Sequence, residues 1–273
     1  MKKIFLISFI FSAVAFSQTL IPKLPQITAS SFLLIDAETN KIIAQQNPEA
    51  STGLASITKI MTSYIVADYL KQGFLNIKDS TTVSEKCWRM EGSRMFIQEG
   101  KKVLIEDLMR GMIIQSGNDA ACALAEHIAG TQEDFASLMN DYAQKMELKN
   151  TNFTNPTGLP NVNHYSTAED IAKLSIVLIN DFPDEYAIYS EKEFTYNDIR
   201  QLNRNSLLWQ DDSIDGIKTG HTRASGYCLV ASSKRADMRL ISIVLNSASE
   251  KSRLQDTRTV SYTHLRAHET LQH

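Results

Sequence analysis

A serine and a lysine lie three residues apart in "LASITKIMTSY", where Ser56 and Lys59 are surrounded by apolar residues. Residues at this spacing share one face of a helix, so the serine hydroxyl and the lysine amine can touch. A lysine buried among apolar side chains loses its proton more readily than a solvated one, and it can then deprotonate a serine. The pair could act as a nucleophile and its base. On this stretch alone, the alternative is that Lys59 extends its amine to water and has no catalytic role.

Two further short motifs could complete such a site. "SGN", Ser116 to Asn118, falls at a break between two apolar helical segments, and "KTG", Lys218 to Gly220, falls on an expected strand. Taken singly, these residues are ordinary in turns and on solvated strand faces. In this chain order, S-x-x-K, S-x-N and K-T-G together form the motif set of the penicillin-recognising serine enzymes.

The resemblance extends beyond the three motifs. The segments "NPTGLP", "YSTAEDIAKL", "IRQLNRNSLLW" and "DGIKTGHTRASGYCLVASS" are similar to the low-molecular-mass penicillin-binding proteins, the serine-type D-alanyl-D-alanine carboxypeptidases, over about Ser30 to Asn246. This resemblance implies a cell-wall hydrolase that removes the terminal D-alanine from peptidoglycan stem peptides through an acyl-enzyme. It also implies that β-lactam antibiotics acylate and inhibit the protein. We expect neither a cofactor nor a metal.

The resemblance assigns the catalytic roles to Ser56, Lys59 and Ser116, and places Lys218 beside them as a substrate-binding residue. Ser56 would attack the carbonyl of the penultimate D-alanine, and water would then cleave the acyl-enzyme. Lys59 would be the general base, kept partly neutral by its apolar surroundings and by a second lysine. Ser116 would relay a proton toward the leaving amine, while Lys218 holds the local field positive.

The remaining site residues would bind the substrate. Asn118 would hydrogen-bond the substrate's amide side chain or the catalytic lysine. Thr219 would receive the terminal carboxylate, and Arg204 in "LNRN" would counter its charge. Gly220 would let the peptide lie against the strand edge as an added strand. The backbone N–H groups of the nucleophile and of His221 would form the oxyanion hole.

Two alternatives accompany this interpretation. The commonest class of β-lactamase needs a glutamate in an E-x-x-L-N loop between the second and third motifs, and that string is absent between Asn118 and Lys218. We therefore expect slow hydrolysis of a penicilloyl-enzyme. A non-catalytic module that binds β-lactams or the cell wall would keep the fold without turnover, although every named catalytic position is filled here.

The elements that must position these residues follow from the patterning. "SSFLLIDAETNKIIAQQN" predicts a β-hairpin, a long helix begins at Ser56, and Thr167 is placed to cap a later helix. Three strands follow in "DGIKTGHT", "GYCLVASSK" and "MRLISIVLN". We predict an α/β (α+β) fold in which a five-stranded antiparallel sheet, flanked by helices, joins the chain ends around a helical insertion. This arrangement is like that of the penicillin-binding transpeptidases and β-lactamases.

The predicted organisation has five parts. Residues 1–17 have the charged start, apolar stretch and small-residue end of a signal peptide, and 18–29 form a linker. The catalytic domain would span 30–259, with a helical subdomain over about 66–181, and a non-native tail would occupy 260–273. We expect an exported, periplasmic protein, on the outer face of the inner membrane in its full-length form.

The tail "VSYTHLRAHET" breaks the family resemblance and looks like the translation of a transposon-derived sequencing adapter. The preceding "SASEKSRLQDTR" looks like the start of a helix, which in the family packs across the sheet beside the first helix. We expect that helix to be cut short and the last dozen or so residues to be poorly ordered.

Charge and cysteine content exclude some classes of function. The 273 residues carry a formal net charge of -3, and there is no basic block, so we expect no nucleic-acid partner. Membrane association would require a C-terminal anchor that this sequence lacks. Cys87, Cys122 and Cys228 are odd in number and widely spaced, so we predict three small structural core residues and no disulfide scaffold.

Overall fold

The computed structural model describes residues 27–235 and 238–271, with the last ten of these described as backbone only. The predicted signal peptide and most of the predicted linker lie outside the described residues. Within the described ranges, no helix combines the length and apolar character needed to cross a bilayer.

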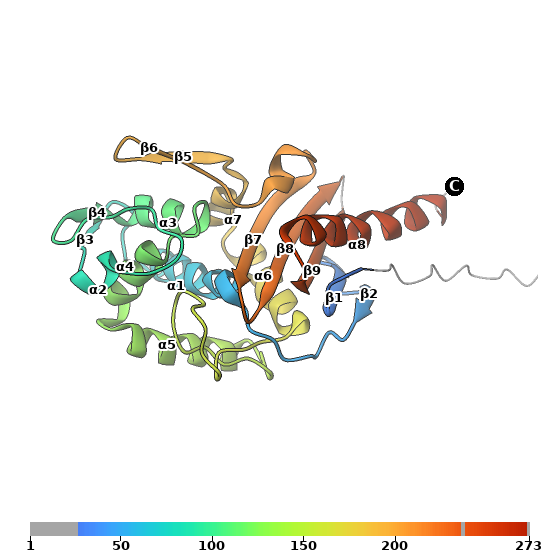
Figure 1. Cartoon of the computed structure of the whole chain (residues 1–273), viewed down its shortest axis with the longest axis horizontal. Helices are drawn as coiled ribbons and strands as arrows, with labels where there is room; N and C mark the ends of the chain where they lie inside the picture. The colour runs from blue at the N-terminus through green and yellow to red at the C-terminus, as the bar shows by residue number, and fades with distance from the viewer. Residues whose placement is uncertain (1–26, 236–237, 272–273) are drawn as a thin grey trace, which may run out of the picture.

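A five-stranded antiparallel sheet forms the centre of the molecule, as predicted (Figure 1). Its order is β2-β1-β9-β8-β7, so strands from the two ends of the chain pair directly, with Ser31 opposite Leu245. Strand β7 lies at one edge. The strands are β1 (Ser31–Asp36), β2 (Ile42–Gln46), β7 (Ile214–Thr222), β8 (Gly226–Arg235) and β9 (Met238–Ser247).

Alternation along the strands gives the sheet two apolar faces, because successive side chains point to opposite sides. On β9, Ile241 and Ile243 belong to the main core, which also holds the buried sides of helices α1 (Lys59–Lys71) and α6 (Ala168–Asp181). Leu240 and Val244 belong to a second cluster on the other face. The sheet is therefore covered on both faces.

Helix α8 (Glu250–Leu271) covers this second face. The prediction of a helix after the last strand is confirmed, but it packs on the face opposite α1 and not beside it. Val260 is fully buried in one cluster with Phe32 and Leu34. The helical backbone is described to Leu271, and the expectation that the last dozen or so residues are poorly ordered stays a prediction.

A helical group precedes α6 in the chain and surrounds the far end of α1 (Figure 1). Its members are α2 (Glu85–Trp88), α3 (Ile105–Ile113), α4 (Asn118–Ala129) and α5 (Gln132–Lys145), with a small hairpin of β3 (Ser80–Thr82) and β4 (Lys102–Leu104). The predicted cap of α6 is confirmed, since Asp170 N donates to Thr167 Oγ1 at 3.1 Å.

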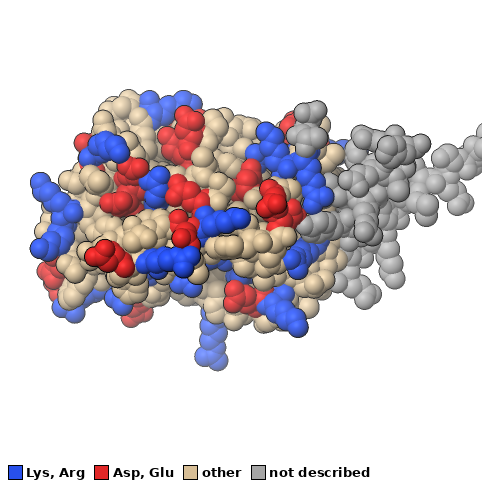
Figure 2. Space-filling model, turned by 90° about the horizontal axis from the view of Figure 1, so that it is seen from above, with Lys and Arg blue, Asp and Glu red and all other residues tan. Residues whose placement is uncertain are grey.

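A second small hairpin follows α6 and was not predicted from the sequence. The elements between α6 and the sheet are α7 (Pro183–Tyr186), η2 (Ala187–Ser190), β5 (Glu193–Tyr196), β6 (Ile199–Leu202) and η3 (Ser206–Trp209). On the face that Figure 2 shows, acidic and basic side chains are interspersed.

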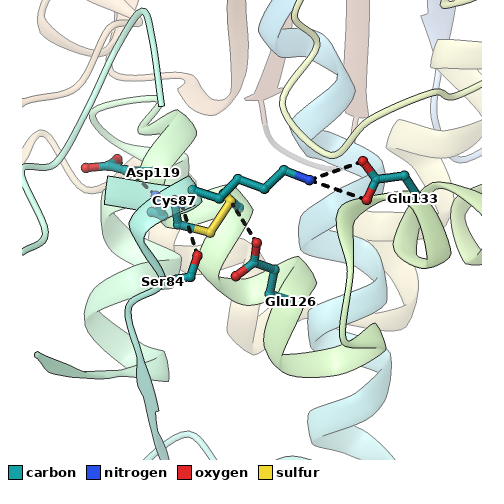
Figure 3. The surroundings of a disulfide bond; sticks show 8 residues. Ser84, Cys87, Asp119, Glu126 and Glu133 are labelled. Atoms are coloured by element: carbon teal, nitrogen blue, oxygen red, sulfur yellow. Dashed lines mark hydrogen bonds and ion pairs between the residues drawn. A yellow bond between two sulfur atoms is a disulfide. The ribbon is translucent and has the colours of Figure 1, made fainter. Parts of the chain in front are cut away.

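The interpretation of all three cysteines as separate core residues is wrong for two of them. Cys87 of α2 and Cys122 of α4 form a disulfide, with their Cα atoms 5.3 Å apart (Figure 3). Both are fully buried, and Cys228 on β8 is a free buried thiol, as predicted. Widely spaced cysteines pair here because α2 packs on α4, which the sequence spacing does not reveal.

Removing this disulfide is expected to lower stability. It closes a loop of 35 residues, and the chain-entropy model gives about 4 kcal/mol for a loop of that length. We expect Cys87→Ala with Cys122→Ala to lower the free energy of unfolding by that order in urea titrations. Addition of a reductant should destabilise the wild type and leave the double variant unchanged, and equal sensitivity of both would contradict the assignment.

Candidate active site

The three motifs meet where α1 begins. Ser56 lies in the short 3-10 helix η1 (Ala55–Thr58), and Lys59 is the first residue of α1. η1 packs against β7, which carries "KTG", and the start of α1 lies close to β7 in Figure 1. Helix α4 begins at Asn118, the last residue of "SGN".

The Lys59 amine is buried and has three hydrogen-bond partners. Its Nζ lies 3.0 Å from Ser56 Oγ, 2.7 Å from Asn118 Oδ1 and 2.7 Å from the Thr157 carbonyl oxygen. The amide and carbonyl oxygens can only accept. A neutral amine has two N–H donors for them, and its lone pair then faces the Ser56 hydroxyl. The contacts suit a base that takes the serine proton.

The environment of Lys59 favours the neutral form. The side chain is 1% exposed. Burial lowers the pKa of Lys59 well below its ordinary value, the positive charge of Lys218 lowers it further, and Asp119 opposes both. The lysine of the first motif is therefore not a surface lysine that reaches water.

The "SGN" motif connects α4 to the loop after α2. Asn118 accepts from Lys59, its Nδ2 donates to the Glu91 carbonyl at 2.6 Å, and its backbone N–H donates to the Ser93 carbonyl at 2.7 Å. The Ser116 hydroxyl is buried and has no hydrogen-bond partner among the described residues. Ser116 has a φ of 65°, a conformation that non-glycine residues adopt rarely and often at functional sites.

The "KTG" motif places a second buried lysine on β7. Lys218 is 2% exposed, and within the described residues its amine donates only to the Thr219 carbonyl, at 3.4 Å. Burial and, to a lesser degree, the charges of Arg204 and Arg253 together lower the pKa of Lys218 to about 7. The amine lacks a carboxylate partner within the described residues.

Gly220 is required by packing on the side of η1. A Cβ at this position would lie 2.9 Å from the Leu54 carbonyl oxygen and 3.2 Å from the Ala55 Cβ. The missing side chain thus lets β7 approach the turn that carries the nucleophile. Contact between the backbone of Gly220 and a substrate stays a prediction.

Positive charge gathers at one end of the site. Arg204, which is exposed, and Arg253 of α8, which is 4% exposed, both act on Lys218 electrostatically. Arg253 pairs with Glu250, whereas Arg204 has no carboxylate partner in the part of the chain that the structure describes. Burying a positive group without an acid, as with Lys218, is costly, so this end of the site suits an anionic ligand.

Sequence reasoning missed Arg253 and three positioning groups. The Thr157 carbonyl holds Lys59, and Gly158 fits beside it because a Cβ there would lie 1.7 Å from the Ala55 carbonyl oxygen. His164 joins this loop to η1 through Thr58 Oγ1 at 2.7 Å. A backbone carbonyl leaves no signal in the sequence, although "NPTG" is a recognisable turn.

His164 is held neutral. Its Nδ1 accepts from the backbone N–H of Thr154 at 3.0 Å, so the ring proton lies on Nε2 and points to Thr58. Burial lowers the pKa of His164 to about 4. The imidazole is therefore a structural connection within this loop.

Asp119 and the disulfide fix the loop between α2 and the site. The Asp119 carboxylate accepts from the backbone N–H groups of Met95 and Phe96, each at 2.9 Å. The disulfide ties α2 to the same helix one turn further on (Figure 3). The loop that contacts Asn118 is thus anchored to α4 at both ends.

The other predicted groups are only partly tested by these contacts. The His221 ring stacks on Tyr227, with centroids 4.0 Å apart, and the oxyanion role of its backbone N–H stays a prediction. Among the described residues, the one grouping of potential metal ligands is Cys87, Cys122 and Glu126, and its two sulfurs are bonded to each other.

Comparison with known proteins gives a consistent result. A family model described as D-alanyl-D-alanine carboxypeptidase matches residues 18–249. The chain is 44% identical to D-alanyl-D-alanine carboxypeptidase DacC of Escherichia coli K12 over 91% of its own length and 64% of that protein. For DacA of Haemophilus influenzae the identity is 47%, over 84% of this chain and 60% of that one.

A solved structure agrees with these matches. The chain superposes on penicillin binding protein 5 from Haemophilus influenzae with a TM-score of 0.85 and 45% identity, covering 88% of this chain and 72% of that one. The chain therefore spans less than two thirds of the length of these two curated relatives.

Proposed function

This chain belongs to the D-alanyl-D-alanine carboxypeptidase family, and from that membership we propose that it removes the terminal D-alanine from peptidoglycan stem peptides. The reaction runs through an acyl-enzyme on Ser56, and β-lactams acylate the same residue. The observation that carries the proposal is the buried Lys59 amine 3.0 Å from Ser56 Oγ, with two pure acceptors occupying its other contacts.

Acylation begins with transfer of the Ser56 proton to Lys59. The Ser56 oxygen attacks the carbonyl of the penultimate D-alanine, and charge develops on the carbonyl oxygen. The backbone N–H groups of Ser56 and His221 stabilise that charge as fixed donors. Lys218 keeps the pKa of Lys59 low and so keeps the base available.

Departure of the terminal residue requires a proton on its amine. The Ser116 hydroxyl has no hydrogen-bond partner among the described residues, so it is free to relay a proton to the leaving amine. The C–N bond breaks, D-alanine leaves, and a water molecule hydrolyses the ester to restore the Ser56 hydroxyl. Asn118 holds Lys59 in place throughout.

The terminal carboxylate of the substrate binds where positive charge gathers. Thr219 donates its hydroxyl, and Arg204 supplies a guanidinium that lacks an acid partner within the described residues. Lys218 and Arg253 add positive charge to the same end of the site. An uncharged terminus would lose this stabilisation.

Thr219→Val and Arg204→Ala are expected to weaken acylation by ligands that bear a carboxylate. Hydrogen bonds to charged groups contribute about 1.5–3 kcal/mol, so each variant should lose about 10–100-fold in kcat/KM for an acid peptide. An amidated peptide should lose little. Arg89→Ala, which removes an exposed arginine paired with Glu85, is the matched control. Equal losses on acid and amide peptides would argue against the role.

Steady-state release of D-alanine tests the proposed function. A purified protein that releases D-alanine from an acyl-D-Ala-D-Ala peptide is a carboxypeptidase, whereas a binding module would take up labelled penicillin without turnover. Rapid hydrolysis of penicillin would instead indicate a β-lactamase. The loop from Asn155 to His164 offers no carboxylate to activate a deacylating water, which supports the carboxypeptidase.

We also propose that the protein is exported. The Cys87–Cys122 disulfide supports this, because disulfides persist in oxidising compartments such as the periplasm. The predicted signal peptide at residues 1–17 would direct the export. Attachment to a membrane and the assignment of 260–273 as a non-native tail stay predictions.

A further inference from the structure

Asp119 is a buried acid that the proposed reaction steps do not use. It is the second residue of α4 and is 1% exposed. Carboxylates are rarely buried unless a partner satisfies them. Here the partners are backbone N–H groups, those of Met95 and Phe96 at 2.9 Å, Ile97 at 3.3 Å and Ala120 at 2.9 Å. The carboxylate therefore fixes three consecutive residues of the loop 91–97.

The same loop holds Asn118. The Glu91 carbonyl accepts from Asn118 Nδ2 at 2.6 Å, and the Ser93 carbonyl accepts from its backbone N–H at 2.7 Å. A Cβ at Gly92, which has a φ of 82°, would lie 2.8 Å from Asn118 Nδ2. The loop thus wraps the amide whose oxygen contacts Lys59 Nζ at 2.7 Å. Movement of the loop would move that amide.

A glycine makes room for the carboxylate beneath the turn of the second motif. A Cβ at Gly117 would lie 2.8 Å from Asp119 Oδ1 and 3.2 Å from the Met95 backbone nitrogen. Gly117 is the middle residue of "SGN", and Ser116 before it has a φ of 65°. The turn that carries Ser116 therefore lies against the hydrogen bond between the carboxylate and the loop. Displacement of the carboxylate would disturb both polar residues of the motif.

The charge of Asp119 reaches the catalytic base. The positive charge of Lys218 on β7 lowers the pKa of Lys59, whereas the negative charge of Asp119 raises it. The other charged or titratable groups around this region are Glu91 and Arg94 of the loop, Asp107 of α3, Tyr196 of β5, Arg204, Arg253 of α8, and His164 beside η1. Within the described residues, Asp119 is thus the acid that offsets the second lysine.

We propose that Asp119 is a positioning residue for the reaction of Ser56: its carboxylate fixes the loop 91–97 and so the Asn118 amide, and its charge offsets that of Lys218. This inference rests on the proposed function. A general base must be neutral at the working pH and still basic enough to take the proton. One acid among two buried lysines keeps the amine from becoming too weak a base.

The experiment measures kcat/KM for D-alanine release from an acyl-D-Ala-D-Ala peptide as a function of pH. Asp119→Asn keeps the size of the side chain, removes its charge and replaces one acceptor oxygen with a donor. We expect the plateau of kcat/KM to fall by about 10–100-fold, because the loop loses charged hydrogen bonds. The rising limb should also move to lower pH by about 1 unit, because the Lys59 amine then loses its proton more readily.

Gly117→Ala separates the two effects, because it displaces the Asp119 carboxylate and keeps its charge. The plateau should fall by about tenfold or more, as misplaced groups react slowly, and the rising limb should stay at its pH. Asp107→Asn is the matched control. It removes a partly buried carboxylate that acts on Tyr196 together with Asp119 but is not among the charges that act on Lys59, so it should change neither property.

Circular dichroism shows which variants are folded. A folded Asp119→Asn variant with an unchanged plateau, or with a rising limb at the wild-type pH, would overturn the inference. A folded Gly117→Ala variant with the wild-type plateau would overturn it as well, even where Asp119→Asn does not fold. Each of these results leaves the proposed function standing, whereas a wild type that releases no D-alanine would overturn the proposed function itself.

Discussion

Replacing Ser56 with alanine is expected to abolish both D-alanine release and labelling by penicillin. Ser56 is the hydroxyl that contacts the buried Lys59 amine, whereas Ser116 has no hydrogen-bond partner among the described residues to activate it. Loss of a serine nucleophile costs on the order of 10⁶-fold in hydrolases of comparable design. Quantitative labelling and a D-alanine assay on the same preparation measure the two effects together.

The matched control for this variant is Ser137→Ala on α5. That exposed serine donates to the Glu133 carbonyl within its own helix and lies outside the site. It should keep full labelling and full release. Undiminished labelling of Ser56→Ala would mean that another residue is the nucleophile, and the assignment of the site would be wrong.

Replacing Lys59 with arginine is expected to reduce acylation by about 10²–10⁴-fold, the usual contribution of a general base. A guanidinium stays protonated in proteins, so it can fill the space and donate to Asn118 without accepting the serine proton. The wild-type acylation rate should rise with pH as Lys59 loses its proton, because the neutral amine is the active form. Burial lowers its pKa, so that rise lies well below pH 10.5.

The pH profile separates a base from a merely structural lysine. Lys59→Arg should lose the rising limb as well as the rate. Lys71→Arg, at the other end of α1, should retain both. A Lys59→Arg variant with near-normal acylation and an unchanged profile would show that Lys59 acts only through its charge.

The sequence predicts the contact between Ser56 and Lys59 because the two residues lie only three positions apart in the chain. Ser56 and Lys59 share a helical turn, and "SGN" and "KTG" carry enough family resemblance to bring Asn118 and Lys218 to it. Strand alternation likewise predicts the central sheet, since apolar periodicity is written along each strand. These features depend on spacing within short stretches.

What the sequence does not show depends on packing between distant elements. Cys87 and Cys122 pair because α2 lies on α4, and the spacing of the cysteines in the sequence does not predict this disulfide. The Thr157 carbonyl is a backbone group, which any residue could supply. Gly220 looks like a site for substrate, yet its missing side chain is required by the contact with η1.

The most direct test of the account is mass spectrometry of the wild-type protein after brief exposure to penicillin. The account predicts one penicilloyl group per molecule, located on the peptide that contains Ser56, and slow loss of that group as the ester is hydrolysed. An adduct on any other residue, or no adduct in a preparation that releases D-alanine, would contradict it.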